Sequence, residues 1–353
     1  MRMEANDNPG RAQPRRIGLF YTKDGGRQLA VRLRGWLEER GYPTRDLSSL
    51  APATGYPGAA PAEGAGAEGV DLLLSLGGDG TLLRATRVVP PGTPVLGVNL
   101  GRVGFLAELG PEELWEALPR LLAGEYAVEE RRLLEGRVLP AARGAAGEAS
   151  GAPAGPQAPE PGRAAGTGPA PGRTPASPVR APVHEPGSRA AGGGPDPAPA
   201  SLWAVNELVL RSAGTARLLH VRVWVGDQLA AEIAGDGVVV ATATGSTAYA
   251  LAAGGPAVPP ELECLVVVPL CSFSLAVRPF LVAPGRTVAV ELVEGSDALL
   301  TADGQETWRC TPGQRLVAGL APRVLRLVRR RPWPFYEVLR AKLFTRPGGG
   351  GRR

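Results

Sequence analysis

A short glycine-rich run with an acidic residue at its centre, Gly77-Gly78-Asp79-Gly80-Thr81, is the part of the sequence best suited to chemistry. Glycines let another molecule approach the backbone closely, and the free N–H groups of a strand–turn–helix unit favour an anion. A carboxylate at such a place needs a metal ion beside it or a chemical task, such as taking a proton from a hydroxyl group. The run therefore predicts a phosphate loop of Gly77, Gly78, Gly80 and Thr81 with Asp79 as candidate base. A simple tight turn is the alternative.

The surrounding elements predict where this run lies. Residues 70–76 form a short apolar segment bounded by glycine, which indicates a buried parallel strand, and Thr81 is expected to cap the helix that follows. Residues 17–21 and 95–99 indicate two more buried strands, and residues 26–40 an amphipathic helix. This alternation predicts a Rossmann-like parallel sheet with its glycine turns at the carboxyl edge, where ligands bind.

Farther along the chain the pattern changes. Residues 111–122 predict one more amphipathic helix, which Pro119 should kink or end early, and residues 333–344 predict a last helix. Between these helices, short β-rich runs follow one another without helices, which predicts an antiparallel, β-sandwich-like domain. The runs are 128–139, 202–210, 218–225, 228–233, 265–269, 287–293 and 316–328.

The fold class expected is thus α/β plus all-β, with an α/β nucleotide-binding domain over 16–125 and a β-rich domain over 126–332. Residues 1–15 are expected to be a disordered leader. Residues 141–200 are almost entirely Ala, Gly, Pro, Arg and Ser, which lack the apolar side chains needed to offset the entropy of ordering. Strand-like runs flank this segment, so it is expected to be a disordered insertion at the tip of a hairpin.

Composition argues against several classes of protein. No uninterrupted apolar run is long enough to cross a bilayer, and the first sixteen residues lack the apolar core of a signal peptide. The three cysteines have no paired spacing, which suits a reducing compartment, so a cytoplasmic protein without membrane contact is expected. With only two histidines, His184 and His220, a His-based triad or metal site is not expected. The net charge is +5, Lys occurs only at 23 and 342, and no nucleic-acid partner is expected.

A second stretch, residues 235–256, reads GDGVVVATATGSTAYALAAGGP. Together with Gly77–Thr81 it resembles the NAD kinase family. The run TGSTAYxLxAGGP is highly specific, whereas GGDGT alone is also found in 6-phosphofructokinases and diacylglycerol-type lipid kinases. The resemblance covers nearly the whole chain outside 141–200 and the two ends. It also rests on PVLGVNLGRVGFLAEL at 94–109, NE at 206–207, SLxxRP at 274–279 and DGQ at 303–305.

The resemblance implies an enzyme that transfers a phosphoryl group from ATP, or from polyphosphate, to the 2′-hydroxyl of the adenosine ribose of NAD, giving NADP. It implies that Asp79 acts as the base, that residues 333–345 pack back on the first domain, and that the chain forms a homodimer or homotetramer. The sequence has no P-loop and hardly any Lys, so Mg²⁺ should be held mainly by phosphates and water, with no protein cage. The implied NAD-binding residues are Asp79, Gly80, Arg84, Asn206, Glu207, Arg217, Asp236, Thr247, Ala248, Tyr249, Ala252 and Gln305.

Two residues depart from the family pattern. Ala252 stands where a Ser is common, and Phe273 stands where many members have His. Two other functions remain open at this point. A lipid or sugar kinase would explain Gly77–Thr81 but not the stretch at 245–256. An inactive nucleotide-binding sensor on the same fold would bind NAD without phosphorylating it.

Overall fold

The computed structural model describes residues 13–50, 67–101, 104–141, 201–214, 218–295, 298–330 and 333–343. These belong to one compact unit, made of residues 1–141 and 194–353. The expectations for residues 1–12, for 142–200 and for Arg217 fall outside the described residues. Within the described ranges, every helix is too short or too polar to cross a membrane.

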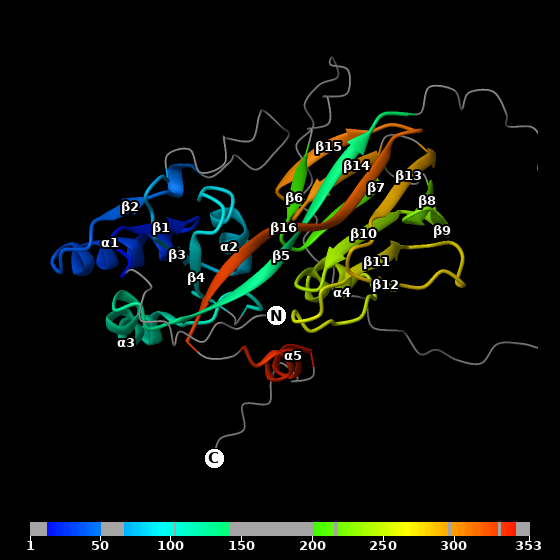
Figure 1. Ribbon diagram of the computed structural model, residues 1–353. Helices are drawn as coiled ribbons and strands as arrows, with labels where there is room; N and C mark the ends of the chain where they lie inside the picture. The colour runs from blue at the N-terminus through cyan, green and yellow to red at the C-terminus, as the bar shows by residue number, and fades with distance from the viewer. Residues whose placement is uncertain are drawn as a thin grey trace, which may run out of the picture. The chain divides into compact units, whose positions relative to one another are not determined.

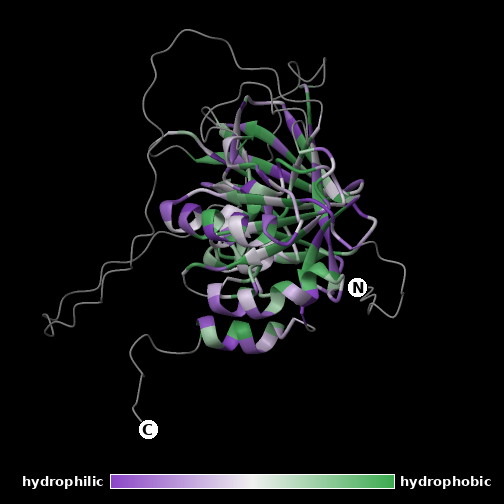
Figure 2. Ribbon diagram, turned by 90° about the vertical axis from the view of Figure 1, so that its left-hand side faces the viewer, coloured by the Kyte–Doolittle hydropathy of each residue, from purple (hydrophilic) through white to green (hydrophobic). Residues whose placement is uncertain are grey.

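The amino-terminal part is a parallel sheet with helices, as predicted. Its strands lie in the order β2-β1-β3-β4, and each pairs in parallel with its neighbours. The apolar faces of the helices are buried against β1, β3 and β4, which are apolar over nearly their whole length, whereas the edge strand β2 is polar (Figure 2). The elements are β1 (Ile17–Tyr21), α1 (Asp24–Glu38), β2 (Thr44–Asp46), η1 (Ser48–Leu50), β3 (Leu72–Leu76), α2 (Asp79–Ala85), β4 (Pro94–Val98) and α3 (Pro111–Leu122).

The rest of the chain is mainly β structure. One sheet has six strands, all antiparallel, in the order β12-β11-β10-β7-β14-β15. Strands β5, β6, β8, β9, β13 and β16 belong to the other sheet, and apolar side chains from both sheets form one core. This confirms the predicted antiparallel sandwich. The elements are β5 (Ala127–Leu139), β6 (Leu202–Ala204), β7 (Glu207–Ser212), β8 (Leu219–Val225), β9 (Gln228–Gly235), β10 (Gly237–Thr242), η2 (Gly245–Thr247), α4 (Tyr249–Ala252), β11 (Leu265–Leu270), β12 (Phe280–Val282), β13 (Val288–Glu294), β14 (Ala298–Ala302), β15 (Glu306–Cys310), β16 (Arg315–Arg329) and α5 (Phe335–Leu343).

Two long strands join the parallel and antiparallel parts. Strands β5 and β16 lie antiparallel along almost their whole length, from the pair Arg315–Leu139 to the pair Arg329–Ala127 (Figure 1). The last part of β16 also pairs in parallel with β4. One sheet therefore continues from β2 through β4 and β16 to β9.

Three local predictions were wrong. Helix α2 begins at Asp79 with Gly78 as its N-cap, so Thr81 lies inside the first turn and does not cap it. Helix α3 does not end early at Pro119 but continues to Leu122, because Leu118, Leu121 and Leu122 are buried and packing offsets the lost backbone bond; the alternative of a kink stays a prediction. Residues 202–210 do not form one strand: β6 and β7 are separated at Val205–Asn206, whose N–H groups bind a side chain instead of a neighbouring strand.

The strands that flank the 141–200 segment pair with each other. Gly136 of β5 lies opposite Leu202 of β6, and Leu134 lies opposite Ala204. This antiparallel pairing is that of a hairpin, and residues 137–140 with Ser201 are enough to close a turn. We therefore expect deletion of residues 141–200 to leave enzyme activity within a few-fold of the full chain, measured at equal folded concentration. A soluble deletion variant without activity would contradict this.

Candidate active site

Asp79 lies where β3 ends, at the carboxyl edge of the parallel sheet, and its carboxylate holds a neighbouring turn. Its Oδ2 accepts a hydrogen bond from the N–H of Phe105 at 2.7 Å. Its Oδ1 accepts hydrogen bonds from the N–H groups of Leu106 and Ala107, both at 3.1 Å. A carboxylate offers about four lone-pair positions, so Oδ2 keeps one for a further donor. Asp79 thus has a fixed position and one acceptor position to spare.

Gly104 allows this close approach. A Cβ atom at Gly104 would collide with the carboxylate of Asp79, whereas one at Gly101 would meet no atom closer than 4.0 Å. Gly104→Ala should therefore displace Asp79 or the turn and lower kcat by about 10- to 100-fold, because small displacements of a catalytic group are costly. Gly101→Ala is the matched control and should leave kcat within about two-fold. Equal kcat values for the two variants, measured by steady-state kinetics, would show that the contact is unimportant.

The glycines of the predicted phosphate loop leave space around the start of α2. Gly78 and Gly80 are exposed, and a Cβ atom at either would meet nothing within 4 Å. Packing of the protein therefore does not account for these two glycines, while close approach of a ligand would. Thr81 is buried beneath them, and its hydroxyl lies 3.0 Å from that of Thr22, which follows β1.

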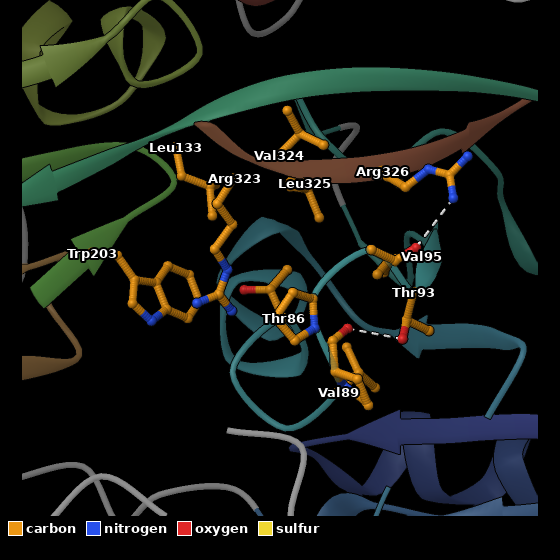
Figure 3. Close-up of a pocket in the computed structure, with 13 residues that line it drawn as sticks. Thr86, Val89, Thr93, Val95, Leu133, Trp203, Arg323, Val324, Leu325 and Arg326 are labelled. Atoms are coloured by element: carbon orange, nitrogen blue, oxygen red, sulfur yellow. Dashed lines mark hydrogen bonds between the residues drawn. The ribbon is translucent and has the colours of Figure 1, made fainter. Parts of the chain in front are cut away.

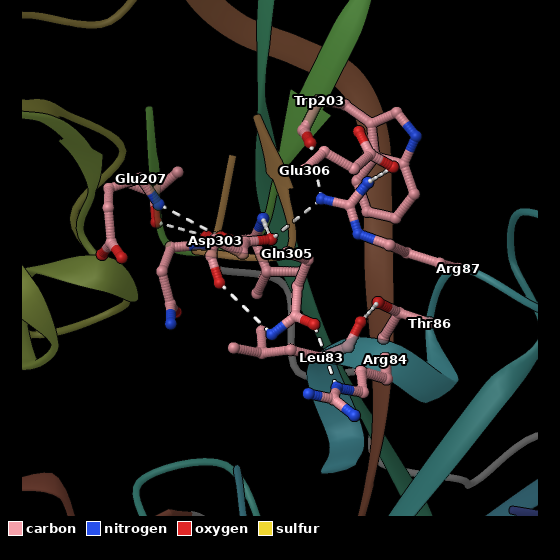
Figure 4. Close-up of polar contacts among 12 residues, drawn as sticks. Leu83, Arg84, Thr86, Arg87, Trp203, Glu207, Asp303, Gln305 and Glu306 are labelled. Atoms are coloured by element: carbon pink, nitrogen blue, oxygen red, sulfur yellow. Dashed lines mark hydrogen bonds and ion pairs between the residues drawn. The ribbon is translucent and has the colours of Figure 1, made fainter. Parts of the chain in front are cut away.

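Arg84 and Gln305 come together from distant parts of the chain. Arg84 on α2 donates from Nε to Oε1 of Gln305, in the turn before β15, at 3.0 Å (Figure 4). The Gln305 amide in turn donates to the carbonyl oxygen of Asp303 at 3.4 Å. Two of the predicted NAD-binding residues, one from each sheet region, are therefore in direct contact.

Asp303 has a role that the sequence analysis missed. Its carboxylate is buried and accepts hydrogen bonds from the N–H groups of Val205, Asn206 and Glu207 at 2.9, 2.7 and 3.2 Å. Arg87 lies 3.5 Å from it and also donates to Glu306 at 2.7 Å (Figure 4). Burial raises the pKa of Asp303, although Arg87 and the three N–H groups oppose the change. Asp303 fixes the backbone that carries Asn206 and Glu207.

Glu207 is a buried acid close to another acid. Burial, followed by the charge of Asp303, raises its pKa to about 8, and a hydrogen bond from the Tyr249 N–H only partly opposes this. Near neutral pH the Glu207 carboxyl is therefore largely protonated, so it can donate as well as accept a hydrogen bond. Two further predicted site residues, Glu207 and Tyr249, are in this way brought together.

The raised pKa makes folding stability depend on pH. The folded state keeps the Glu207 proton from the usual pKa of 4.5 up to about 8, while the unfolded state loses it. Stability should therefore fall as pH rises through this window, by roughly 3–5 kcal/mol from this group. Glu207→Gln should remove that part of the slope in denaturant unfolding between pH 4 and 9. The control Glu232→Gln, at an exposed position on β9, should keep the wild-type dependence of stability on pH. If wild type, Glu207→Gln and Glu232→Gln all have the same dependence, Glu207 does not contribute to it.

The remaining predicted residues surround Tyr249 at the start of α4. Tyr249 is 44% exposed, and partial burial raises the pKa of its phenol, which the charge of Arg211 opposes and that of Asp236 reinforces. Asp236 precedes β10, is exposed, and binds the thiol of Cys271. Thr247 and Ala248 are half-buried, Ala252 is exposed at the end of α4, and Phe273 is 83% exposed.

Lys342 brings a positive charge to the turn held by Asp79. This residue of α5 places its Nζ 4.3 Å from the centre of the Phe105 ring. Burial lowers the pKa of Lys342, and the charge of Asp79 opposes that change. The chain has only one other lysine, so the residue type could have drawn attention to this position, but nothing in the sequence connects position 342 with position 79.

A further pocket is bordered by other residues. It is lined by Thr86, Leu133, Trp203, Arg323 and Arg326 among others, and none of the predicted site residues borders it (Figure 3). Arg87 and Arg323 lie over the Trp203 ring, each 4.4 Å from its centre. In the part of the chain that the structure describes, no three His, Cys, Asp or Glu side chains gather as a metal site would require.

Two family models match parts of this chain. Residues 62–126 match the family described as the ATP-NAD kinase N-terminal domain, and residues 205–329 match the ATP-NAD kinase C-terminal domain. An NAD kinase from Symbiobacterium thermophilum is 35% identical over 87% of this chain and 90% of its own length. One from Moorella thermoacetica is 34% identical over 96% of this chain and 91% of its own length.

Solved structures show the same fold at lower identity. An NAD kinase from Archaeoglobus fulgidus in complex with ATP has a TM-score of 0.61 and 22% identity, covering 90% of this chain and 94% of that one. Yeast NADH kinase complexed with NADH has a TM-score of 0.66 and 18% identity, and the match covers 96% of this chain and 90% of that one. The present protein is a kinase, a phosphotransferase with an α/β part and a β-sandwich part. It belongs to the NAD kinase family.

Proposed function

We propose that this protein transfers a phosphoryl group from ATP to the 2′-hydroxyl of the adenosine ribose of NAD, giving NADP, with Asp79 as the general base. The observation that carries the proposal is the fixed carboxylate of Asp79 with one acceptor position left on Oδ2. That atom receives the proton of the ribose hydroxyl, whose oxygen attacks the γ-phosphorus of ATP while the bond from that phosphorus to the bridging oxygen breaks and ADP leaves. The open space above Gly78 and Gly80 suits the phosphates of the donor.

The other predicted residues bind the dinucleotide in this proposal. Asn206 and Glu207, fixed by Asp303, supply amide and carboxyl hydrogen bonds to the nucleoside, and Tyr249 presents an exposed ring beside them. Lys342 contributes positive charge next to Asp79. Mg²⁺, when present with the nucleotide, would offset the charge of the phosphates, and its ligands would be mainly phosphate and water oxygens. The implied roles of Thr247, Ala248, Ala252 and Arg217 stay predictions, as do polyphosphate use, the oligomer, the cytoplasmic location and the domain limits.

A phosphoacceptor panel tests the proposal. The purified protein is incubated with Mg²⁺, with ATP or polyphosphate, and with NAD, NADH, diacylglycerol or fructose 6-phosphate in turn. NADP formation from NAD is the expected result. Folded protein that binds NAD and phosphorylates none of the four would instead be a nucleotide sensor, in which the three N–H bonds of Asp79 have only a structural role.

A further inference from the structure

A buried cluster of charges connects strands β5 and β16 behind the turn that Asp79 holds. Glu129, Arg131 and Arg329 are only 1%, 4% and 1% exposed. Arg329 donates from Nε to Glu129 at 2.8 Å, and Nη2 of Arg131 lies 2.7 Å from the other oxygen of Glu129. Removing three charges from water is costly, and an apolar cluster of similar volume would often be at least as stable. Such a cluster therefore calls for a reason beyond stability.

Arg329 acts directly on the turn. Its Nη1 donates to the carbonyl oxygen of Leu106 at 2.9 Å, while the N–H of Leu106 donates to Asp79 at 3.1 Å. The backbone of Leu106 is thus held on one side by Arg329 and on the other side by Asp79. Because the same N–H groups fix the Asp79 carboxylate, a shift of the turn would also shift Asp79.

Arg131 extends the cluster to the second glycine-rich segment. It donates from Nη1 to the hydroxyl of Thr244 at 3.3 Å. The carbonyl oxygen of Thr244 accepts a hydrogen bond from the hydroxyl of Thr247, three residues later, at 3.2 Å. One carboxylate, Glu129, therefore connects two guanidinium groups, one contacting each of the segments on which the proposed function depends.

We propose that Glu129, Arg131 and Arg329 are positioning residues for phosphoryl transfer, and that Arg329 acts by holding the Phe105–Ala107 turn against Asp79. This inference rests on the proposed function, because its kinetic effect passes through Asp79. The three residues contact no reacting atom in this scheme. They fix the distance between the base and the groups that bind the dinucleotide.

The chemistry of arginine suits this task. A guanidinium group is planar and donates in several fixed directions, whereas an ammonium group is a compact charge that cannot reproduce that fork. Arg329 uses the fork to reach Glu129 and Leu106 together, and its Cζ lies 4.2 Å from the centre of the ring of Trp333, just before α5. Burial disfavours the charge of Glu129, but Arg131 and Arg329 outweigh burial and hold its pKa below the usual range. The carboxylate of Glu108 also faces Arg329, at 3.8 Å.

Arg329→Lys tests the inference and Arg326→Lys is its matched control. Arg326 lies on the same strand and pairs with Glu130 of β5, but its other contact is the carbonyl oxygen of Gly92, away from Asp79. Arg329→Lys should lower kcat by about 10- to 100-fold and change KM for NAD by less than about threefold, since positioning of the base is lost and not binding. The control should keep both constants within about twofold. Equal kcat values for the two variants would overturn the inference.

A double-mutant cycle separates positioning from general damage. If Arg329 acts through Asp79, Arg329→Lys should cause almost no further loss of kcat in an Asp79→Asn background. Independent, multiplying losses would contradict the inference. Hydrogen exchange of the Phe105–Ala107 amides supplies a readout without activity: it should be faster in Arg329→Lys and unchanged in Arg326→Lys.

If Arg329→Lys fails to fold, Trp333→Leu serves as the second variant, because it removes the stacked ring without stranding a buried charge. It should give a smaller loss of kcat in the same direction, again with faster exchange at residues 105–107. Unchanged kcat and exchange in this variant would overturn the inference. A wild-type protein that makes no NADP would reject the proposed function. It would leave the contact between Arg329 and the Phe105–Ala107 turn open to test, since hydrogen exchange does not depend on activity.

Discussion

Asp79→Asn should lower kcat for NADP formation by about 100- to 10,000-fold, the range expected when a general base is removed. The amide is nearly the same size as the carboxylate, and its oxygen can still accept N–H groups of the Phe105–Ala107 turn. Its NH₂ group, however, replaces one acceptor and cannot take a proton from the ribose hydroxyl. We therefore expect NAD affinity, measured by calorimetry, to change by less than about tenfold while kcat collapses.

In Asp79→Asn, the hydrogen bonds of the turn determine which carboxylate oxygen the NH₂ group replaces. Oδ1 accepts two N–H groups and Oδ2 accepts one, so the amide oxygen is expected to take the Oδ1 position and the NH₂ to stand where the hydroxyl would be deprotonated. Asp24→Asn, at the first residue of the neighbouring helix α1, is the matched control and should leave kcat within about twofold. Activity that survives in Asp79→Asn would keep the enzyme but leave positioning and charge neutralisation as the sources of its rate.

Asp303→Asn should lower the free energy of unfolding by roughly 3–5 kcal/mol, because it removes the charge that Arg87 faces in a buried site. The amide can accept only some of the N–H groups of Val205, Asn206 and Glu207, and its own NH₂ must face the others or Arg87. Denaturant unfolding at pH 7 gives the size of the loss.

An exposed carboxylate with similar hydrogen bonds supplies the control for Asp303. Oδ2 of Asp71 accepts the N–H groups of Arg15 and Arg16 at 2.8 and 2.9 Å, in an exposed place. Asp71→Asn should cost no more than about 1 kcal/mol, since water can replace the lost acceptor. If both variants lose the same free energy of unfolding, the burial of Asp303 does not increase its contribution to stability. In folded Asp303→Asn, weaker NAD binding is also expected, because Asn206 and Glu207 lose their anchor.

Much of the fold could be predicted because runs of apolar residues and the spacing of strands and helices are visible in short stretches of sequence. The apolar run before Gly77 and the alternation of strands with helices identified the parallel sheet, and closely spaced β-rich runs identified the sandwich. Short strands such as β2 and β12 were missed because three residues carry no detectable period. The single run at 202–210 was misread because its break depends on Asp303, which lies almost one hundred residues later.

The candidate site was predictable in its residue types but not in its contacts. The glycine-rich run selected Asp79, and the resemblance to the NAD kinase family implied Arg84 and Gln305, yet only the fold brings Arg84 against Gln305. Arg329 belongs to a run of three arginines, which on its own suggests a solvated basic patch. The structure buries Arg329 against Glu129, because strands β5 and β16 pair there, and no local pattern indicates a partner two hundred residues away.

The pairing of β4 with β16 also affects how the chain can fold while it is being synthesised. Pro94 and Val95 pair with Arg326 and Leu327, so the parallel sheet has an open edge at β4 until residues 326 and 327 have left the ribosome. Contacts between residues so distant in sequence form slowly, and an unpaired strand edge invites association with other chains. The β4 edge can therefore be paired only after Arg326 and Leu327 have been synthesised, and a fragment that ends near residue 125 is expected to expose this edge and associate with other chains, even though it contains the complete Gly77–Thr81 run.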